Sequence, residues 1–207
     1  MIVIIDYGLG NLHSIQNMIK KIGIDSLISY NIEHIKNATK LILPGIGAFD
    51  SGMSNLRQRN LPETLHQRVI EQGVPILGIC LGMQLLTRGS EEGGREEPGL
   101  GWIPADTVRF TMSGNTDLKV PHMGWNFADF AQESVLSHNM PDDSRFYFVH
   151  SYHLTCDSRA HELMSTTYGY PFASAIQRDN IYGVQFHPEK SHKYGMQLLR
   201  NFIEKVD

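Results

Sequence analysis

The residue best suited to covalent chemistry is Cys80, which lies in the pentapeptide Gly78-Ile79-Cys80-Leu81-Gly82. A short apolar run precedes the cysteine and a helical pattern begins at Leu81, which is the order of a nucleophile elbow with cysteine in place of serine. The helix N-terminus favours the thiolate, and the Leu81 N–H is free to stabilise an oxyanion. A buried structural cysteine, with glycines that serve helix–strand packing, is the alternative that this pentapeptide alone leaves open.

A general base with its own orienting group follows at the end of a strand-like run, in the segment Gln185–Ser191. Residues two apart on an extended chain point to the same side, and Pro188 biases His187 toward extended geometry, so Glu189 can reach the His187 ring. Alone, the pattern is more typical of a strand end with solvated side chains. Together with Cys80 it supplies a nucleophile, a base and an orienting carboxylate, which makes catalysis the better interpretation.

A third segment, Pro44–Phe49, follows a strand that should border the Cys80 strand. Its glycines, Gly45 and Gly47, allow the backbone to approach a ligand closely or to swing a peptide N–H toward it. The segment is no dinucleotide fingerprint, because G-x-G-x-x-G would need glycine at Asp50. The sequence has no Walker motif, C-x-x-C or H-E-x-x-H, so we expect neither a cofactor nor a metal. Cys156 lies in a polar stretch without an elbow and is expected to be an incidental thiol.

The elements that must position these residues alternate in the first half of the chain. Apolar runs predict strands at Ile2–Ile5, Asp25–Ser29, Lys40–Leu43 and Pro75–Ile79, and helical spacing predicts helices at Leu12–Ile22 (with Asn11 as the N-cap), Leu61–Gln72 and Leu81–Arg88. The second half predicts strands at Trp102–Thr111, Arg145–His153, Glu162–Tyr168, Phe172–Gln177 and Ile181–Phe186, and a final helix from about His192 to Lys205. We therefore expect an α/β fold in one domain over residues 1–207, with a mostly parallel central sheet, flanking helices on both faces and an antiparallel β extension.

Composition excludes several classes of function. Hydrophobic residues make up 41% and charged residues 19% of the 207 residues, as is ordinary for a globular protein. The formal net charge of −4, without a basic run, disfavours nucleic-acid binding. The most apolar stretch, Val74–Leu86, is too short and too often broken to span a membrane. No leader-like pattern precedes the first strand and the two cysteines cannot form a disulfide framework, so a cytoplasmic protein is expected.

Six segments spread along the chain resemble the class I, triad-type glutamine amidotransferases, and within them the family of glutaminase subunits of imidazole glycerol phosphate synthases. The Cys80 and His187-Pro188-Glu189 segments are typical of the superfamily, whereas the Met123–Asn126 and Phe148–Tyr152 segments are typical of the narrower family. The six segments are Asp6–Leu12, Leu43–Phe49, Gly78–Leu86, Val120–Asn126, Tyr147–Tyr152 and Phe186–Ser191.

The resemblance implies that Cys80 attacks the side-chain amide of L-glutamine, that His187 moves the protons and that Glu189 orients His187. It implies an oxyanion hole formed by the N–H of Leu81 and by one from the Gly45–Gly47 segment, assigned here to Gly47. By the same similarity, glutamine would be bound by Gly45, Gln84, Glu92, His150, Ser151 and Tyr152. A carboxylate such as Glu92 is a sensible partner for the α-ammonium group, although a solvated loop acid is the alternative.

Members of the family dock on a (β/α)8-barrel synthase (cyclase) subunit as a heterodimer, and ammonia passes through the barrel. The positions that match the docking face are Asn11, Pro121, Met123, Trp125, Tyr147 and Lys190. For a tryptophan or methionine in a loop, core filling is the alternative. His192 departs from the histidine-pathway pattern, which commonly has a small residue there, and resembles paralogues that supply ammonia for amidination of a surface-polysaccharide sugar. Histidine biosynthesis is the first hypothesis, and the sugar pathway is the alternative.

Two further classes of function are alternatives to a glutaminase. A cysteine peptidase could use the same elbow and histidine, but it needs an open cleft, whereas a free amino acid needs groups that grip its two ends. A non-catalytic binding module would have no need for Cys80, His187 and Glu189 together.

Overall fold

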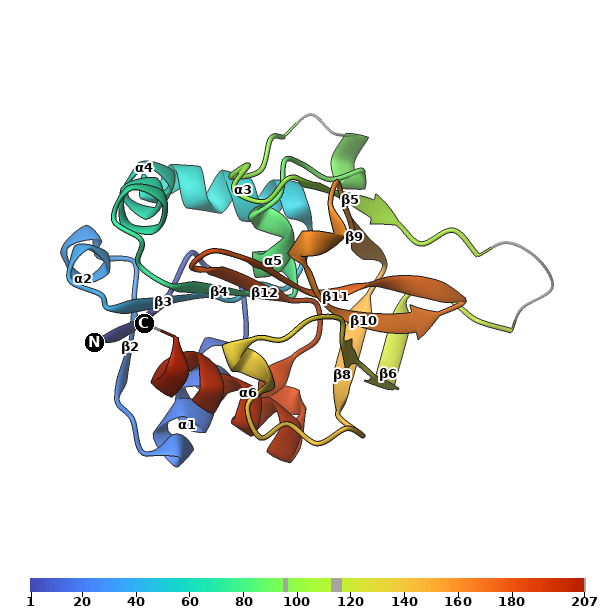
Figure 1. Cartoon of the computed structure of the whole chain (residues 1–207). Coiled ribbons are helices and arrows are strands. Elements are labelled where there is room, and N and C mark those ends of the chain that lie inside the picture. Colours follow the sequence, from blue (N-terminus) through green and yellow to red (C-terminus); the bar gives the residue numbers. More distant parts are fainter. Residues whose placement is uncertain (95–96, 113–116, 207) are drawn as a thin grey trace.

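The computed structural model describes residues 1–94, 97–112 and 117–206, and its centre is a mixed β-sheet (Figure 1). The parallel part of this sheet runs in the order β2 (Ser26–Ser29), β1 (Ile2–Ile5), β3 (Lys40–Leu43), β4 (Ile76–Ile79) and β12 (Ile181–Val184). In the pairing of β3 with β4, Leu43 lies opposite Gly78. The segments that follow these two strands therefore emerge side by side at one edge of the sheet.

Helices cover both faces of the parallel part, because its short strands are apolar on both sides. Along β1, Ile2 and Ile4 pack in the cluster that includes α1 (Leu12–Ile22) and α6 (His192–Lys205). Val3 and Ile5 pack in the cluster on the other face (Figure 1), which includes α2 (Ile32–Lys36), α3 (Phe49–Gln58), α4 (Leu61–His66) and α5 (Leu81–Leu85). The helix α4 continues into a π-helical turn, Gln67–Glu71. The predicted α/β architecture is confirmed.

The antiparallel extension continues the sheet from β12 through β11 (Tyr170–Arg178) and β10 (Glu162–Tyr168) to β7 (Asp129–Phe130). The strand β9 (Tyr152–Cys156) pairs with β11 and with β5 (Ala105–Arg109). A separate pair is formed by β6 (His122–Phe127) and β8 (Arg145–His150), in which His122 lies opposite His150. Within the described ranges, no helix combines the length and apolar character that crossing a membrane requires.

Several local predictions were wrong. The single strand expected over Arg145–His153 is divided at Ser151, because β8 pairs with β6 whereas β9 pairs with β5 and β11. The helix expected to end at Arg88 ends at Leu85. Asn11 occupies the N-cap position of α1 but its side chain does not cap the helix. The elements α2, α3 and β6 were not predicted at all.

Candidate active site

Cys80 occupies a sharp turn between β4 and α5. Its backbone has φ 55° and ψ −111°, in a region that non-glycine residues adopt only when their surroundings enforce it. The Cys80 N–H donates to the Val184 carbonyl of β12 at 2.8 Å, which fixes the start of the turn. A Cβ on Gly82 would overlap the Leu43 carbonyl oxygen, and one on Gly78 would lie 2.7 Å from the Gly82 oxygen. Glycine is therefore required on both sides of the cysteine, as the nucleophile-elbow interpretation predicts.

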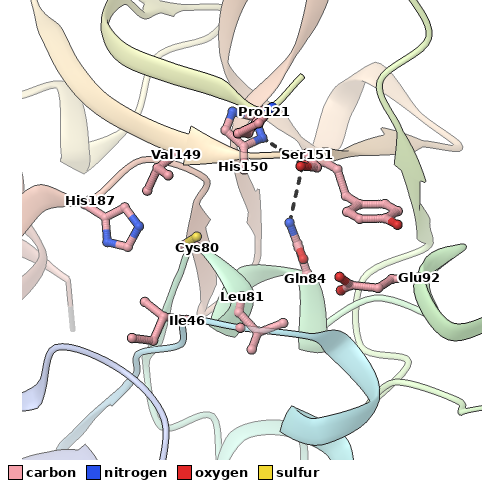
Figure 2. Close-up of a pocket in the computed structure, with 12 residues that line it drawn as sticks. Ile46, Cys80, Leu81, Gln84, Glu92, Pro121, Val149, His150, Ser151 and His187 are labelled. Atoms are coloured by element: carbon pink, nitrogen blue, oxygen red, sulfur yellow. Dashed lines mark hydrogen bonds between the residues drawn. The ribbon is translucent and has the colours of Figure 1, made fainter. Parts of the chain in front are cut away.

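His187 and Glu189 form a buried pair beside Cys80. The His187 Nδ1–H donates to Glu189 Oε1 at 2.8 Å, and the other ring nitrogen faces the Cys80 sulfur (Figure 2). His187 itself has the predicted extended backbone, with φ −102° and ψ 97°. The chain does not stay extended beyond it, however, and Glu189 reaches the ring through a 3₁₀ turn over Pro188–Lys190. Ser191 holds this turn, since its hydroxyl donates to the His187 carbonyl at 2.6 Å and accepts from the Tyr147 N–H at 3.0 Å.

The electrostatics of this pair favour an ionised state. Burial alone lowers the pKa of His187, but Cys80 and Glu189 raise the pKa of His187 to about 10. Burial raises the pKa of Glu189, whereas hydrogen bonds from His187 and Asn11 lower it, and the net direction is downward. Asn11 Nδ2 donates to Glu189 Oε1 at 2.9 Å, which explains why the Asn11 side chain does not cap α1. The predicted nucleophile, base and orienting carboxylate thus lie together, and the surroundings of the imidazole favour its charged form.

The two expected oxyanion donors differ in how firmly they are held. Leu81 is the first residue of α5, so its N–H has no partner within the helix. In the part of the chain that the structure describes, no hydrogen bond holds the peptide groups of Ile46 and Gly47. Gly47 has φ 106°, and a Cβ there would meet nothing within 4 Å. The elbow donor is fixed by the fold, whereas the second peptide is free to turn.

Gly45, at the start of the same loop as Ile46 and Gly47, is buried and does not line the cavity above Cys80. A Cβ on Gly45 would lie 2.5 Å from the Tyr7 hydroxyl and 2.7 Å from the Gly82 nitrogen, so glycine is required there for close packing. The Tyr7 hydroxyl is buried and has no hydrogen-bond partner among the described residues. Burial, and secondarily Cys80, raises the pKa of Tyr7. Tyr7 was not among the predicted site residues.

A cavity of about 350 Å³ opens over the Cys80 sulfur (Figure 2). Gln84 Nε2 donates to the Tyr152 carbonyl at 3.4 Å and to Gln185 Oε1 at 3.1 Å. The Glu92 carboxylate accepts from the Phe49 N–H at 2.8 Å, at the start of α3, and Figure 2 shows it turned toward Gln84. The lining residues are Ile46, Gly47, Cys80, Leu81, Gln84, Glu92, Pro121, Val149, His150, Ser151, Tyr152 and His187.

A cysteine–histidine–glutamate group beside a partly open cavity with amide and carboxylate side chains can hydrolyse the amide of a small, polar molecule. The family model for class I glutamine amidotransferases matches residues 3–206. This chain belongs to the class I glutamine amidotransferases. It is 55% identical over 206 residues to imidazole glycerol phosphate synthase subunit HisH 2 of Methanococcus maripaludis, with 100% of each chain covered. It is 50% identical over 206 residues to the protein of the same name from Pseudomonas aeruginosa, again with 100% of each chain covered.

Solved structures support the same fold. The structure of PurLQS from Thermotoga maritima has a TM-score of 0.77 at 12% identity and covers 100% of this chain and 98% of that chain. A crystal structure of a glutamine amidotransferase has a TM-score of 0.75 at 19% identity, covering 98% of this chain and 97% of the other. At these identities the likeness concerns the fold alone.

The residues expected at a docking face of this amidotransferase gather around β6. On alternate positions of this strand, Met123, Phe127 and Trp125 are 61%, 54% and 44% exposed. Trp125 packs on Tyr147 at a centroid distance of 6.3 Å, and the Lys190 ammonium lies 5.5 Å from the centre of the Tyr147 ring. Pro121 is exposed at the rim of the cavity. Asn11, which is half-buried, donates to Glu189, the residue next to Lys190, so it also contacts the catalytic group.

Three residues in or behind this site, Gln185, His122 and Asn126, were not predicted as site residues from the sequence. Gln185 donates to the Cys80 sulfur at 3.7 Å and bonds Gln84, and its position two residues before His187 on a strand was the available signal. His122 and Asn126 lie behind the cavity and are bonded to each other at 3.2 Å. The alternation of polar and apolar residues in His122–Phe127 predicts the reverse orientation, because apolar side chains normally face the core, whereas here His122 is buried and the apolar side chains of the strand are exposed.

Proposed function

We propose that this amidotransferase is the glutaminase subunit of an imidazole glycerol phosphate synthase and hydrolyses L-glutamine to L-glutamate and ammonia. The observation that carries the proposal is the arrangement of Cys80, His187 and Glu189, of which Cys80 and His187 line a cavity of about 350 Å³. The full-length identity to subunits of that name supports it.

In the first half of the reaction, the Cys80 thiolate attacks the carbon of the side-chain amide and its negative charge moves to the carbonyl oxygen. The Leu81 N–H and an N–H from the Gly45–Gly47 segment stabilise this oxyanion. His187, protonated beside Glu189, gives its proton to the departing nitrogen, so ammonia leaves and a glutamyl thioester remains. In the second half, neutral His187 takes a proton from water, the hydroxide attacks the thioester, and glutamate leaves as Cys80 is restored.

Recognition of glutamine falls to the polar groups on the far side of the cavity from His187. We assign the α-ammonium group to the Glu92 carboxylate, and the remaining polar contacts to Gln84, Ser151 and Tyr152, which line the same wall. Gln84 and Glu92 place an amide and a carboxylate at the wall of the cavity away from His187, which suits the charged end of a free amino acid better than a continuous peptide chain. This favours a glutaminase over a cysteine peptidase.

The partner is a (β/α)8-barrel synthase subunit that docks on the face around Met123, Trp125, Tyr147 and Lys190 and receives the ammonia. Pro121 lies at the cavity and is exposed, so the route from Cys80 to this face is short. Exposed methionine and aromatic side chains on one face of a strand, as at Met123, Trp125 and Phe127, are typical of a protein interface.

The histidine pathway is our first candidate, and amidination of a surface-polysaccharide sugar is the second. The observation that favours the second is His192, which stacks on Trp125 at 5.4 Å and an interplanar angle of 2°. The residue that departs from the histidine-pathway pattern therefore lies on the surface where the barrel is recognised.

Two experiments test the proposal. Cys80→Ala in the complex with the barrel subunit should abolish glutamine-dependent turnover while ammonia-dependent turnover by the barrel survives. Equal loss of both, with the partner still bound, would mean that Cys80 is structural. A strain that lacks its own glutaminase subunit should grow without histidine when it carries this chain together with a barrel subunit that binds it, which would assign the histidine pathway. Failure to grow, with intact glutaminase activity of the same pair in vitro, would contradict the histidine pathway.

A further inference from the structure

Behind the cavity, a chain of hydrogen bonds leads from the glutamine pocket to the outer strand β6. Asn126 Nδ2 lies 3.2 Å from His122 Nε2, and His122 Nδ1 lies 2.9 Å from His150 Nε2. His150 Nδ1 lies 2.7 Å from the Tyr152 carbonyl oxygen. The three side chains are contributed by β6 and β8, which pair with His122 opposite His150.

The direction of every bond in this chain is determined by its ends. A carbonyl oxygen only accepts, so the His150 Nδ1 carries hydrogen and, in a neutral ring, its Nε2 is a bare acceptor. His122 must then donate from Nδ1, which leaves His122 Nε2 to accept from the Asn126 amide. The amide orientation is consistent, since Asn126 Nδ2 also donates to the Thr167 carbonyl at 3.0 Å and its Oδ1 accepts from the Phe127 N–H at 2.9 Å.

Both rings are held neutral. Burial lowers the pKa of His122 to about 4. Burial also lowers the pKa of His150, to about 3, and the neighbouring histidines add to this effect although the bond to Tyr152 opposes it. The His122 ring is stacked between Phe148 and Tyr168, at centroid distances of 4.7 and 4.0 Å. A neutral, stacked ring with a fixed tautomer is a rigid connector.

The inner end of the chain is part of the glutamine cavity. The Tyr152 carbonyl accepts from both His150 Nδ1 and Gln84 Nε2, and both bonds are drawn in Figure 2. His150, Tyr152 and Gln84 all line the cavity. If His150 turned, the Tyr152 carbonyl would lose its shorter bond, and the Gln84 amide would lose a fixed acceptor.

The outer end belongs to the strand that carries the exposed apolar side chains. Successive side chains of β6 alternate, so His122 and Asn126 point inward while Met123, Trp125 and Phe127 are exposed. His122 and the exposed side chains belong to the same strand, so a partner that moves β6 by binding to its outer side also moves His122.

We infer that His122 is a positioning residue, which acts through His150 to fix the Tyr152 carbonyl and Gln84 for glutamine and which ties this wall of the cavity to β6. The inference rests on the proposed glutaminase function. His122 does not touch the substrate, so its effect is expected on glutamine binding rather than on the chemical step.

The kinetic test uses one variant that keeps the packing of the ring and one that keeps a hydrogen-bond donor. His122→Phe retains the stacking but leaves His150 Nε2 without its donor, and in the complex it should raise the KM for glutamine about three- to tenfold with kcat within about twofold. His122→Asn restores a donor near the Nδ1 position and should recover at least half of the loss. His153→Phe is the matched control, because His153 is buried in the same aromatic cluster but bonds Tyr170 and Leu154 instead. An unchanged KM in folded His122→Phe, or an equal rise in His153→Phe, would overturn the inference.

A spectroscopic test is independent of activity. In the full-length protein labelled with ¹⁵N-histidine, His122 and His150 should both appear as the neutral Nδ1–H tautomer between about pH 6 and pH 8. His122→Phe should shift the His150 Nε2 signal. The Nε2–H tautomer or a charged ring at either residue would overturn the inference. If the wild-type complex released no glutamate, the proposed function would fail, and the nitrogen spectra would still decide the arrangement of the histidines.

Discussion

Replacing Glu189 by glutamine would test whether a buried carboxylate sets the charge of the catalytic imidazole. The side chains of His187 and Glu189 are 2% and 1% exposed, so little solvent screens the 2.8 Å contact between them. Glutamine keeps the size of the side chain and one oxygen acceptor but removes the negative charge. The pKa of His187 should then fall from about 10, because burial of the ring opposes protonation and one of the groups that supports it is gone.

We expect the glutamine-dependent kcat of the complex with the barrel subunit to fall about 10²–10⁴-fold, the range associated with general acid–base groups and with loss of the orienting carboxylate. The assay is release of glutamate at saturating glutamine, with ammonia-dependent turnover by the barrel as the internal control. Glu204→Gln is the matched variant, since Glu204 is 39% exposed and pairs only loosely with Arg200 at 3.9 Å. A Glu189→Gln enzyme within about threefold of wild type would refute the assigned role of Glu189.

The same variant makes a prediction about stability and pH. The pKa of His187 is raised in the folded protein from 6.5 to about 10. The stability that follows from this shift is fully present below about pH 6.5 and is lost as the pH rises through about 10. Urea unfolding of the wild type between these values should show a falling free energy, and the fall should be smaller in Glu189→Gln. A parallel dependence on pH in both proteins would mean that Glu189 is not what raises the pKa of His187.

Three further predictions concern the elbow, the second thiol and the loop beside the cavity. Gly82→Ala should destabilise the protein by about 3 kcal/mol or more, measured by urea unfolding, because its Cβ would overlap the Leu43 carbonyl oxygen, whereas Gly89→Ala, with its nearest neighbour at 3.8 Å, should not. Cys156→Ser should leave the glutaminase and synthase rates within about twofold of wild type, because burial raises the pKa of Cys156 to about 12 and so disfavours the reactive thiolate. A large loss of rate would show that this thiol takes part in the chemistry. The isolated chain should release glutamate about 10²–10³ times more slowly than the complex whose barrel holds its substrate, since one oxyanion donor is not fixed, and full turnover by the chain alone would contradict this.

The parts of the fold that could be predicted from the sequence are those in which one local rule dominates. Ile2–Ile5 and His192–Lys205 were predicted with the observed bounds, because a short apolar run and a long amphipathic spacing each have one reasonable interpretation. The division of Arg145–His153 at Ser151 could not be predicted, since it depends on β6 and β5, distant strands that pair with its two halves. The helix α3 was missed because Asp50, Ser51 and Gly52 near its start are poor helix formers, and its first N–H finds its acceptor in Glu92, far along the chain.

In the site, too, features set by neighbouring residues could be predicted and features set by distant residues could not. The glycines on both sides of Cys80 allow the sharp turn there, so the pentapeptide was sufficient to predict an elbow. The contact of His187 with Glu189 was predicted, but from extended geometry, and the actual 3₁₀ turn depends on Ser191 and Tyr147. The role of Asn11 as a partner of Glu189 joins residues 178 positions apart and left no local signal. Contacts of this kind become visible only when the sheet brings the ends of β1 and β12 to the same edge.

The nucleophile and its proton donor are held by strands, a strained turn and buried hydrogen bonds, whereas the Ile46 and Gly47 peptides are held by no bond among the described residues. Moving the nucleophile or its proton donor would disturb the core of the sheet, because the Cys80 N–H is bonded to β12 and Gly82 packs against the end of β3. Turning a peptide in the glycine-containing loop breaks no hydrogen bond and moves no buried side chain, since Ile46 is exposed. A partner that has only a docking face to act on can therefore change the rate through this loop at low cost, without disturbing the elbow. Control of glutamine hydrolysis is accordingly expected in the Gly45–Gly47 segment, and the thiol, the imidazole and the carboxylate are expected to keep one arrangement in the free and the bound states.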